Sequence, residues 1–149
     1  AAFLRYWNKP EETVGKWRDG WLRTGDIGRR ETDGVITYVS RDDDVITSSG
    51  YRIGPSEIET CLTGHPDVVM CAVVGLPDPR RGEAVTAFVV APDRGPDLEN
   101  ELISRVSAQI SPHMTPRSVQ FVDSLPMTAT GKILRRALRE SENESDVRK

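Results

Sequence analysis

Two apolar segments, residues 68–74 and 85–90, constrain the fold of this chain more than any other feature. Each is a nearly continuous apolar run of strand length, which is typical of a buried strand. The segment between them, residues 76–83, contains two prolines, two arginines and a glycine, and we expect it to form a loop. Strands of this kind need helices to cover them, so the pattern predicts a layered domain.

Helices are predicted on either side of these strands in the sequence. One opens at residues 54–55, where a proline suits the first helical turn, and a glycine and a proline at 64–66 end it. A second begins at residues 96–97 and carries an apolar residue at every fourth position, which gives one buried stripe. A short strand at 119–122 and a final helix beyond residue 132 complete the order. We therefore predict an α+β domain with about three main strands and packed helices.

The residues before Arg41 have a different character. They are rich in aromatic residues and turn formers, and no helical stripe in them is longer than a turn or two. The pair Asp33-Gly34, followed by the β-branched and aromatic residues 35–39, predicts a hairpin turn and a strand. We expect short strands here, with too little apolar mass for an independent core.

The change of character after Arg41 predicts three parts. Residues 1–42 form the first, residues 43–140 the α+β domain, and residues 141–149 a polar, flexible tail. The sequence does not begin with Met, which suggests a piece of a longer protein.

Composition narrows the functional classes. The 149 residues carry a formal net charge of −3 and a mean hydropathy of −0.45, and this mild acidity argues against a nucleic-acid partner. No apolar run approaches the roughly 20 residues that span a bilayer, so no membrane partner is expected. The first residues do not form a signal peptide, and we expect a cytoplasmic location. The two cysteines and two histidines lack the spacing of metal ligands, so no metal site is predicted.

The pair Gly131-Lys132 is the first of three candidate functional groups. It follows a turn of small and hydroxylated residues at the point where we expect a basic helix to begin. The amino end of a helix carries partial positive charge, so a lysine there needs another reason, and an external anion is one. An exposed loop lysine is the plain alternative. A rival interpretation joins Lys132 to a basic patch for nucleic acid or acidic lipid: Arg135, Arg136 and Arg139.

The other two groups precede it. Asp26 follows a glycine turn and can accept hydrogen bonds from a sugar diol, although from spacing alone an Asx turn is favoured. Arg41 and Arg52 flank the acidic block 42–44 and Gly50, and arginine forks suit phosphate oxygens. A solvated turn in which the arginines pair with the aspartates explains the second group equally well.

Taken in order, four segments resemble the carboxyl-terminal end of the adenylate-forming superfamily. They are residues 24–26, 38–46, 50–59 and 125–132. This superfamily contains AMP-forming acyl-CoA synthetases, peptide-synthetase adenylation domains and luciferases. The resemblance implies a small mobile lid domain, preceded by short strands from the end of a large amino-terminal domain. It favours short- or medium-chain and acetyl-CoA-synthetase-like members.

The resemblance also implies an activity and roles for individual residues. Such enzymes convert a carboxylate and ATP into an acyl-adenylate and pyrophosphate, and CoA then displaces AMP. Lys132 matches the catalytic lysine that bridges the carboxylate and the α-phosphate, and Asp43 matches the hinge. The remaining matches are nucleotide-binding and CoA-facing residues: Asp26, Arg41 and Arg52 for the nucleotide, and Gly50 and Tyr51 for CoA.

Further expectations concern partners. ATP or AMP, CoA and Mg²⁺ are expected, bound mainly through the large amino-terminal domain, because this chain has no Ser/Thr/Gly-rich phosphate loop. That domain is itself the expected partner, together with the carboxylic acid. The resemblance also implies a lysine acetyltransferase and deacetylase as further partners, because Pro126, Gly131 and Lys132 are spaced as in relatives that are controlled by acetylation. The chain alone is expected to be inactive. The alternatives are an adenylation domain that loads a carrier protein, and a non-catalytic interaction or acetylation-target module.

Overall fold

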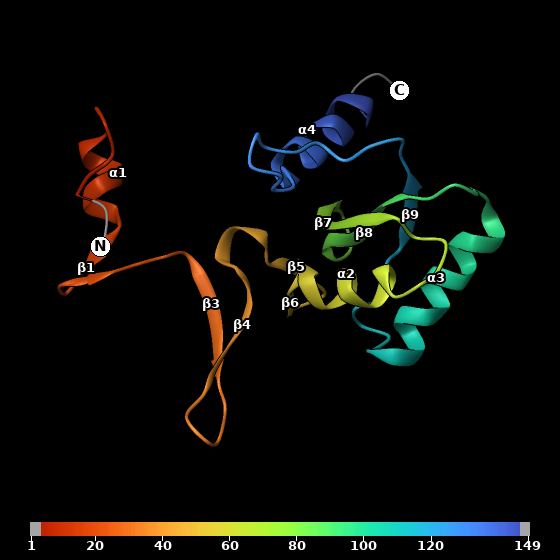
Figure 1. Cartoon of the computed structure of the whole chain (residues 1–149), viewed down its shortest axis with the longest axis horizontal. Helices are drawn as coiled ribbons and strands as arrows, with labels where there is room; N and C mark the ends of the chain where they lie inside the picture. The colour runs from red at the N-terminus through yellow and green to blue at the C-terminus, as the bar shows by residue number, and fades with distance from the viewer. Residues whose placement is uncertain (1–3, 147–149) are drawn as a thin grey trace. The chain divides into compact units, whose positions relative to one another are not determined.

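The structure is a computed structural model that describes residues 4–146. The chain divides into two compact units, Ala1–Asp43 and Asp44–Lys149. Figure 1 shows the elements of both. The described part of the first unit contains α1 (Pro10–Gly15), β1 (Trp17–Arg18), β2 (Trp21–Leu22), β3 (Asp26–Arg30) and β4 (Ile36–Arg41), and the short 3-10 turn Asp42–Asp44 follows.

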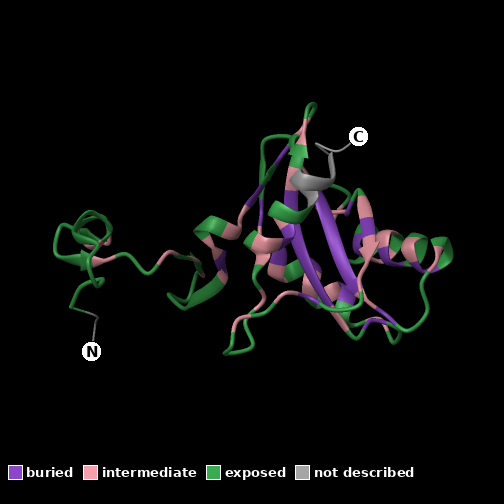
Figure 2. Cartoon of the chain, turned by 90° about the horizontal axis from the view of Figure 1, so that it is seen from above, coloured by how far each residue is buried: buried purple, intermediate pink, exposed green. Residues whose placement is uncertain are grey.

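The first unit is built from two antiparallel strand pairs, β1 with β2 and β3 with β4. The predicted hairpin turn at Asp33-Gly34 is confirmed: the Asp33 carboxylate accepts the N–H of Val35 at 3.0 Å, and Gly34 has a φ of 87°. Among residues 4–43, Ser40 is the only one that is buried, as the green and pink colours of this unit in Figure 2 illustrate. The apolar side chains of the first unit therefore form no core of their own, as predicted.

The second unit is an α+β domain. Its elements are β5 (Ile46–Ser48), β6 (Tyr51–Ile53), α2 (Pro55–Thr63), β7 (Met70–Asp78), β8 (Gly82–Val90), α3 (Pro96–Gln109), β9 (Ser118–Phe121) and α4 (Arg135–Asp146). They form a five-stranded sheet in the order β6-β5-β8-β7, with β9 parallel to β8. The long strands β7 and β8 with β9 are the main ladder, and β5 and β6 add a small hairpin. The predicted fold class is confirmed.

Both faces of this sheet are buried, which explains why β7 and β8 are continuous apolar runs. Cys71 and Val73 of β7 pack in the core cluster formed with α2 and α3. Ala72 and Val74, which alternate with them, pack in a second cluster with Leu138 of α4. Because successive strand residues point to opposite faces, α2 and α3 cover one face and α4 covers the other, as Figure 1 shows.

The prediction of a loop at residues 76–83 is wrong. Strand β7 continues to Asp78 and β8 begins at Gly82, so these two residues pair and only a tight turn separates the strands. Pro77 is tolerated because β7 is an edge strand, where a missing N–H need not break a ladder. The Asp78 carboxylate shapes the turn by accepting the N–H groups of Arg80 and Arg81, and these bonds lower the pKa of Asp78.

The end of the chain also differs from expectation. Helix α4 continues through Asp146, so residues 141–146, predicted as part of a flexible tail, are helical; the rest of that tail lies outside the described residues. Arg136 and Glu140 form an i,i+4 ion pair at 2.6 Å, and such pairs favour a helix. Across residues 4–146, no helix combines the length and apolar character that a bilayer span needs.

Candidate functional site

Lys132 lies on a tight turn that is closed by its own backbone. The Thr128 N–H donates to the Lys132 carbonyl at 2.8 Å, and the Lys132 N–H donates to the Thr128 hydroxyl at 3.0 Å. Gly131 has a φ of 78°, a conformation that glycine adopts without strain. Met127 and Ile133 form an isolated antiparallel bridge below the turn. We call residues 126–134 the lysine turn.

This geometry corrects the reasoning from the helix dipole. Helix α4 begins at Arg135, three residues after Lys132, so the lysine is not the first residue of the helix. Its position reflects the lysine turn instead, which exposes the side chain. The base of the turn is well held: Leu125 is buried, and the Leu134 N–H donates to the Pro126 carbonyl at 2.8 Å. The result is an exposed cation on a fixed backbone.

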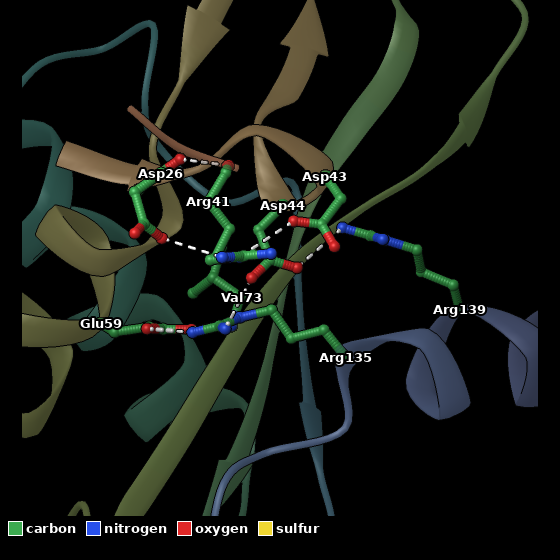
Figure 3. Close-up of polar contacts among 9 residues, drawn as sticks. Asp26, Arg41, Asp43, Asp44, Glu59, Val73, Arg135 and Arg139 are labelled. Atoms are coloured by element: carbon green, nitrogen blue, oxygen red, sulfur yellow. Dashed lines mark hydrogen bonds and ion pairs between the residues drawn. The ribbon is translucent and has the colours of Figure 1, made fainter. Parts of the chain in front are cut away.

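An ion network, which sequence reasoning missed, lies next to this turn (Figure 3). The Arg135 guanidinium donates to both carboxylate oxygens of Glu59, at 2.9 and 2.8 Å, and to Asp44 at 3.0 Å. Arg139 lies 3.7 Å from the other Asp44 oxygen. Burial opposes the charge of Arg135, but the two carboxylates outweigh it and raise the pKa of Arg135. Three of the four cations in the rival basic patch are thus ion-paired, since Arg136 binds Glu140.

In the first unit, Arg41 gathers the predicted nucleotide residues (Figure 3). It donates to Asp26 at 2.9 Å, to the Thr24 carbonyl at 2.9 Å and to Asp43 at 3.3 Å. The hydrogen bond with Asp26 is the main cause that raises the pKa of Arg41. Gly25 leaves room for this arrangement, because a Cβ there would lie 3.0 Å from the guanidinium.

A hollow of about 450 Å³ opens beside these residues within the first unit. Its lining includes Gly25, three basic residues and three acidic ones: Lys16, Arg23 and Arg41, and Glu12, Asp42 and Asp43. The formal charges of this lining balance, so the lining alone does not select an anion, while Gly25 admits a ligand close to the backbone. The signal for Lys16 and Arg23 in the sequence is only their charge, which is why pattern reasoning did not single them out.

Gly50 and Tyr51 lie on the hairpin between β5 and β6. Ser49 and Gly50 have φ values of 51° and 84°, as the central residues of a type I′ turn require. Tyr51 stacks on His113, with ring centroids 4.3 Å apart and an interplanar angle of 19°. Arg52 follows in β6, opposite Thr47. His113 comes from the segment between α3 and β9, so this neighbour could not be read from the motif. Lys132 and Gly50 occupy two separate turns.

Residues 4–146 contain no cluster of side chains that could bind Mg²⁺. No three His, Cys, Asp or Glu side chains there gather in a way that suits a metal ion. The three adjacent acids of the 3-10 turn, Asp42–Asp44, do not converge, because Asp43 pairs with Arg41 and Asp44 with Arg135.

Comparison with known proteins identifies the family. The profile of the AMP-binding enzyme C-terminal domain matches residues 57–132, about half of the chain, and its last matched residue is Lys132. The chain belongs to the AMP-binding enzyme C-terminal domain family. It is 48% identical over 145 residues to the mitochondrial acyl-coenzyme A synthetase ACSM4 of Rattus norvegicus, covering 94% of this chain and 25% of that protein.

Two further similarities support the same family. The long-chain-fatty-acid–CoA ligase of Bacillus subtilis is 43% identical over 140 residues, again 94% of this chain and 25% of that protein. ATP-bound MatB of Rhodopseudomonas palustris has the same fold, with a TM-score of 0.83 and 34% identity over 93% of this chain and 28% of that one. This family member thus spans about a quarter of the length of its curated relatives.

Proposed function

We propose that this chain is the carboxyl-terminal part of an ATP-dependent acyl-CoA synthetase. In the parent enzyme a carboxylate and ATP give an acyl-adenylate and pyrophosphate, and CoA then gives the thioester and AMP. The observation that carries the proposal is the exposed Lys132, held on a closed turn at the end of the family match. Similarity to acyl-CoA synthetases over 94% of the chain supports the reaction class.

Lys132 is proposed to act in the first half-reaction. Its ammonium group holds the carboxylate of the acid and the α-phosphate of ATP together, and it offsets the negative charge that builds as the new bond forms. An exposed lysine on a fixed turn suits this task, because the backbone is settled and the long side chain reaches outward. The lysine supplies position and charge, and the bond changes occur between the two substrates.

The residues of the first unit are proposed to hold the nucleotide. Asp26 accepts hydrogen bonds from the ribose hydroxyls and is held in place by its hydrogen bond from Arg41. Arg41, which lines the hollow beside Gly25, contacts phosphate. Residues 1–42 belong in this proposal to the end of the large adenylation domain. Mg²⁺ arrives bound to the ATP phosphates, and no step is assigned to it.

The second half-reaction is assigned to the hairpin of β5 and β6. Gly50 has no side chain and a positive φ, so the pantetheine arm of CoA can pass along its backbone, beside Tyr51. Arg52 contacts phosphate in one of the two domain orientations. Asp43 is the hinge about which residues 43–140 turn between half-reactions, because hinges place their rotation at very few positions. We propose that the reaction takes place in the cytoplasm.

Two alternative functions can be tested by the same experiments. An adenylation domain would pass the acyl group to a carrier protein instead of CoA, and a non-catalytic module would serve as an interaction or acetylation target. In either enzyme, acetylation of Lys132 by a lysine acetyltransferase would remove its charge and block the first half-reaction, and a deacetylase would restore it.

The test uses the full-length enzyme that contains this chain. We expect acid-dependent ATP–pyrophosphate exchange and CoA thioester formation with at least one of a panel of short- to long-chain carboxylic acids. Lys132→Ala should abolish exchange but retain thioester formation from a synthetic acyl-adenylate. The chain of residues 1–149 alone should show no exchange. Absence of exchange with every acid, or unchanged exchange in Lys132→Ala, contradicts the proposal.

A further inference from the structure

A single ion network joins α2 and α4 around the edge of the sheet. The two helices cover opposite faces, yet the Glu59 carboxylate of α2 binds the Arg135 guanidinium of α4 at 2.8 and 2.9 Å. Glu59 also accepts the N–H of Val73 at 2.8 Å, and Val73 belongs to the edge strand β7. Figure 3 shows Val73 beside the contact between the acid and the arginine. The network therefore wraps around β7 and fixes both helices to the same strand.

The charged groups of this network are largely removed from water. The side chains of Arg135, Glu59 and Asp44 are 19%, 16% and 17% exposed. Arg135 Nε and Nη2 donate to Glu59 Oε1 and Oε2 at 3.3 and 2.8 Å. A planar guanidinium that binds a carboxylate through two nitrogens in this way fixes direction as well as distance. Loss of the arginine would leave two largely buried carboxylates without their main counter-ion, which is strongly destabilising.

Arg135 is also the residue at which the lysine turn meets the helix. It is the first residue of α4 and the third after Lys132. The chain between them has little freedom because two backbone hydrogen bonds hold it. The Leu134 N–H donates to the Pro126 carbonyl at 2.8 Å, and the Thr128 N–H donates to the Lys132 carbonyl at 2.8 Å. Any shift of the Arg135 backbone therefore displaces the lysine turn.

The next residue provides a natural comparison. Arg136 has a side chain that is 88% exposed, and it pairs with Glu140 on its own helix. The two arginines are adjacent and carry the same charge, but Arg136 ties α4 to no other element through that pair. A difference between them in function would therefore report the network and not the charge of the helix.

We propose that Arg135 is a positioning residue for Lys132. By binding Glu59 and Asp44 it fixes the start of α4, and with it the lysine turn, at the place from which Lys132 reaches the carboxylate and the α-phosphate. This inference rests on the proposed function. It makes the first half-reaction sensitive to Arg135, because a displacement of about 1 Å at a reacting group costs on the order of 100-fold in rate.

The experiment compares Arg135→Lys and Arg135→Gln with Arg136→Lys and Arg136→Gln in the full-length enzyme. Lysine keeps the charge but loses the bidentate fork. For Arg135→Lys we expect kcat of acid-dependent ATP–pyrophosphate exchange to fall about tenfold or more, with KM for ATP within about twofold. Thioester formation from a synthetic acyl-adenylate should stay within about twofold of wild type, because Lys132 acts only in the first half-reaction. The Arg136 variants should match wild type in both assays.

Hydrogen exchange adds a readout that does not depend on turnover. Peptides that cover residues 126–134 should exchange faster in Arg135→Lys than in Arg136→Lys. If neither Arg135 variant folds, Glu59→Gln, which keeps an acceptor for Val73, replaces them with the same expectations.

The outcomes separate the two proposals. A wild-type enzyme without acid-dependent exchange overturns the proposed function and the positioning role with it. An active wild type in which Arg135→Lys and Arg136→Lys behave alike overturns only the positioning role. Equal loss of both half-reactions in Arg135→Lys, or unchanged hydrogen exchange in residues 126–134, also overturns it, because either result indicates a general effect on the domain or none on the turn.

Discussion

Asp43 and Asp44 are adjacent in the chain, but their carboxylates bind arginines of different units. Asp43 accepts from Arg41 of the first unit at 3.3 Å, and Asp44 accepts from Arg135 of the second at 3.0 Å. The boundary between the units falls at the peptide bond that joins them. A hinge at this position, as we propose, leaves both ion pairs intact while the units turn, because each pair lies within one unit.

This relationship predicts unequal costs for the same substitution. Asp44→Asn weakens a pair with Arg135 in which both side chains are less than a fifth exposed, so we expect a loss of about 1–3 kcal/mol in the free energy of unfolding. Asp43→Asn weakens a pair whose aspartate is 76% exposed, and about 0–1 kcal/mol is expected. Urea unfolding of the full-length protein, followed by limited proteolysis of the small domain, measures the difference. Equal costs would show that burial of the network does not matter.

Gly75 predicts a packing limit in the middle of β7. A Cβ there would lie 2.7 Å from the Glu83 carboxyl carbon and 2.9 Å from Ile46 Cγ2. Glu83 cannot move freely, because its carboxylate accepts the N–H of Thr47 in β5. Gly75→Ala should therefore destabilise the domain by about 1–3 kcal/mol.

Gly15→Ala is the control for this prediction. It lies in α1, and a Cβ at that position meets nothing within 4 Å. We expect it to change stability by no more than about 0.5 kcal/mol. Melting temperatures of both variants decide the matter: a neutral Gly75→Ala would mean that the β5 hairpin yields without cost.

The sequence predicts which strand and helix faces are buried better than it predicts which strands and side chains pair. The runs in β7 and β8 are continuous because both strand faces are buried, and the stripe of α3 recurs every four residues because one face is buried, so both were predictable. The hairpin through Pro77 was not, because a proline at an edge position looks the same in sequence as one in a loop. Glu59 and Arg135 are 76 residues apart, and no local period relates an acid on one face of a sheet to an arginine on the other.

In the candidate site too, residues in contiguous motifs could be predicted, whereas their partners from distant segments could not. Short motifs made Lys132 and Asp26 candidate site residues through the resemblance to a family, since each motif is contiguous. The partners that hold motif residues in place come from distant segments, as His113 does for Tyr51. The dipole reasoning about Lys132 was wrong because helix starts depend on the hydrogen bonds of the preceding turn.

Cys71 should be chemically inert in the folded protein. Burial, followed by the nearby Glu59 carboxylate, raises the pKa of the Cys71 thiol from 9.0 to about 12. The thiolate, which is the reactive form, is therefore scarce below that pH. Iodoacetamide at pH 8 should label Cys61, which is partly exposed, while Cys71 is labelled only after unfolding. Peptide mass spectrometry before and after urea distinguishes the two.

The same shift predicts a dependence of stability on pH. The folded state keeps the Cys71 proton up to about pH 12, whereas the unfolded state loses it near pH 9.0. The contribution of this thiol to stability is therefore full below pH 9 and falls as the pH rises toward 12, because the unfolded state binds fewer protons there. Cys71→Ala should flatten this part of the stability profile. A profile that is equally steep in Cys71→Ala would assign the loss to other groups.

The Tyr51–His113 stack predicts that the thioester step depends on an aromatic ring and not on a hydroxyl. Tyr51 follows the turn at Ser49 and Gly50, and His113 holds its ring from a segment 62 residues away. Stacked rings contribute about 0.5–1.5 kcal/mol, so His113→Ala should slow thioester formation from a synthetic acyl-adenylate about 2- to 10-fold. Tyr51→Phe keeps the ring and should stay near wild type, while Tyr51→Ala should match His113→Ala. ATP–pyrophosphate exchange should be unchanged in all three, because the hairpin is assigned to the second half-reaction. A loss in Tyr51→Phe as large as that in Tyr51→Ala would instead assign the effect to the hydroxyl, whose oxygen lies 3.4 Å from His113 Nε2.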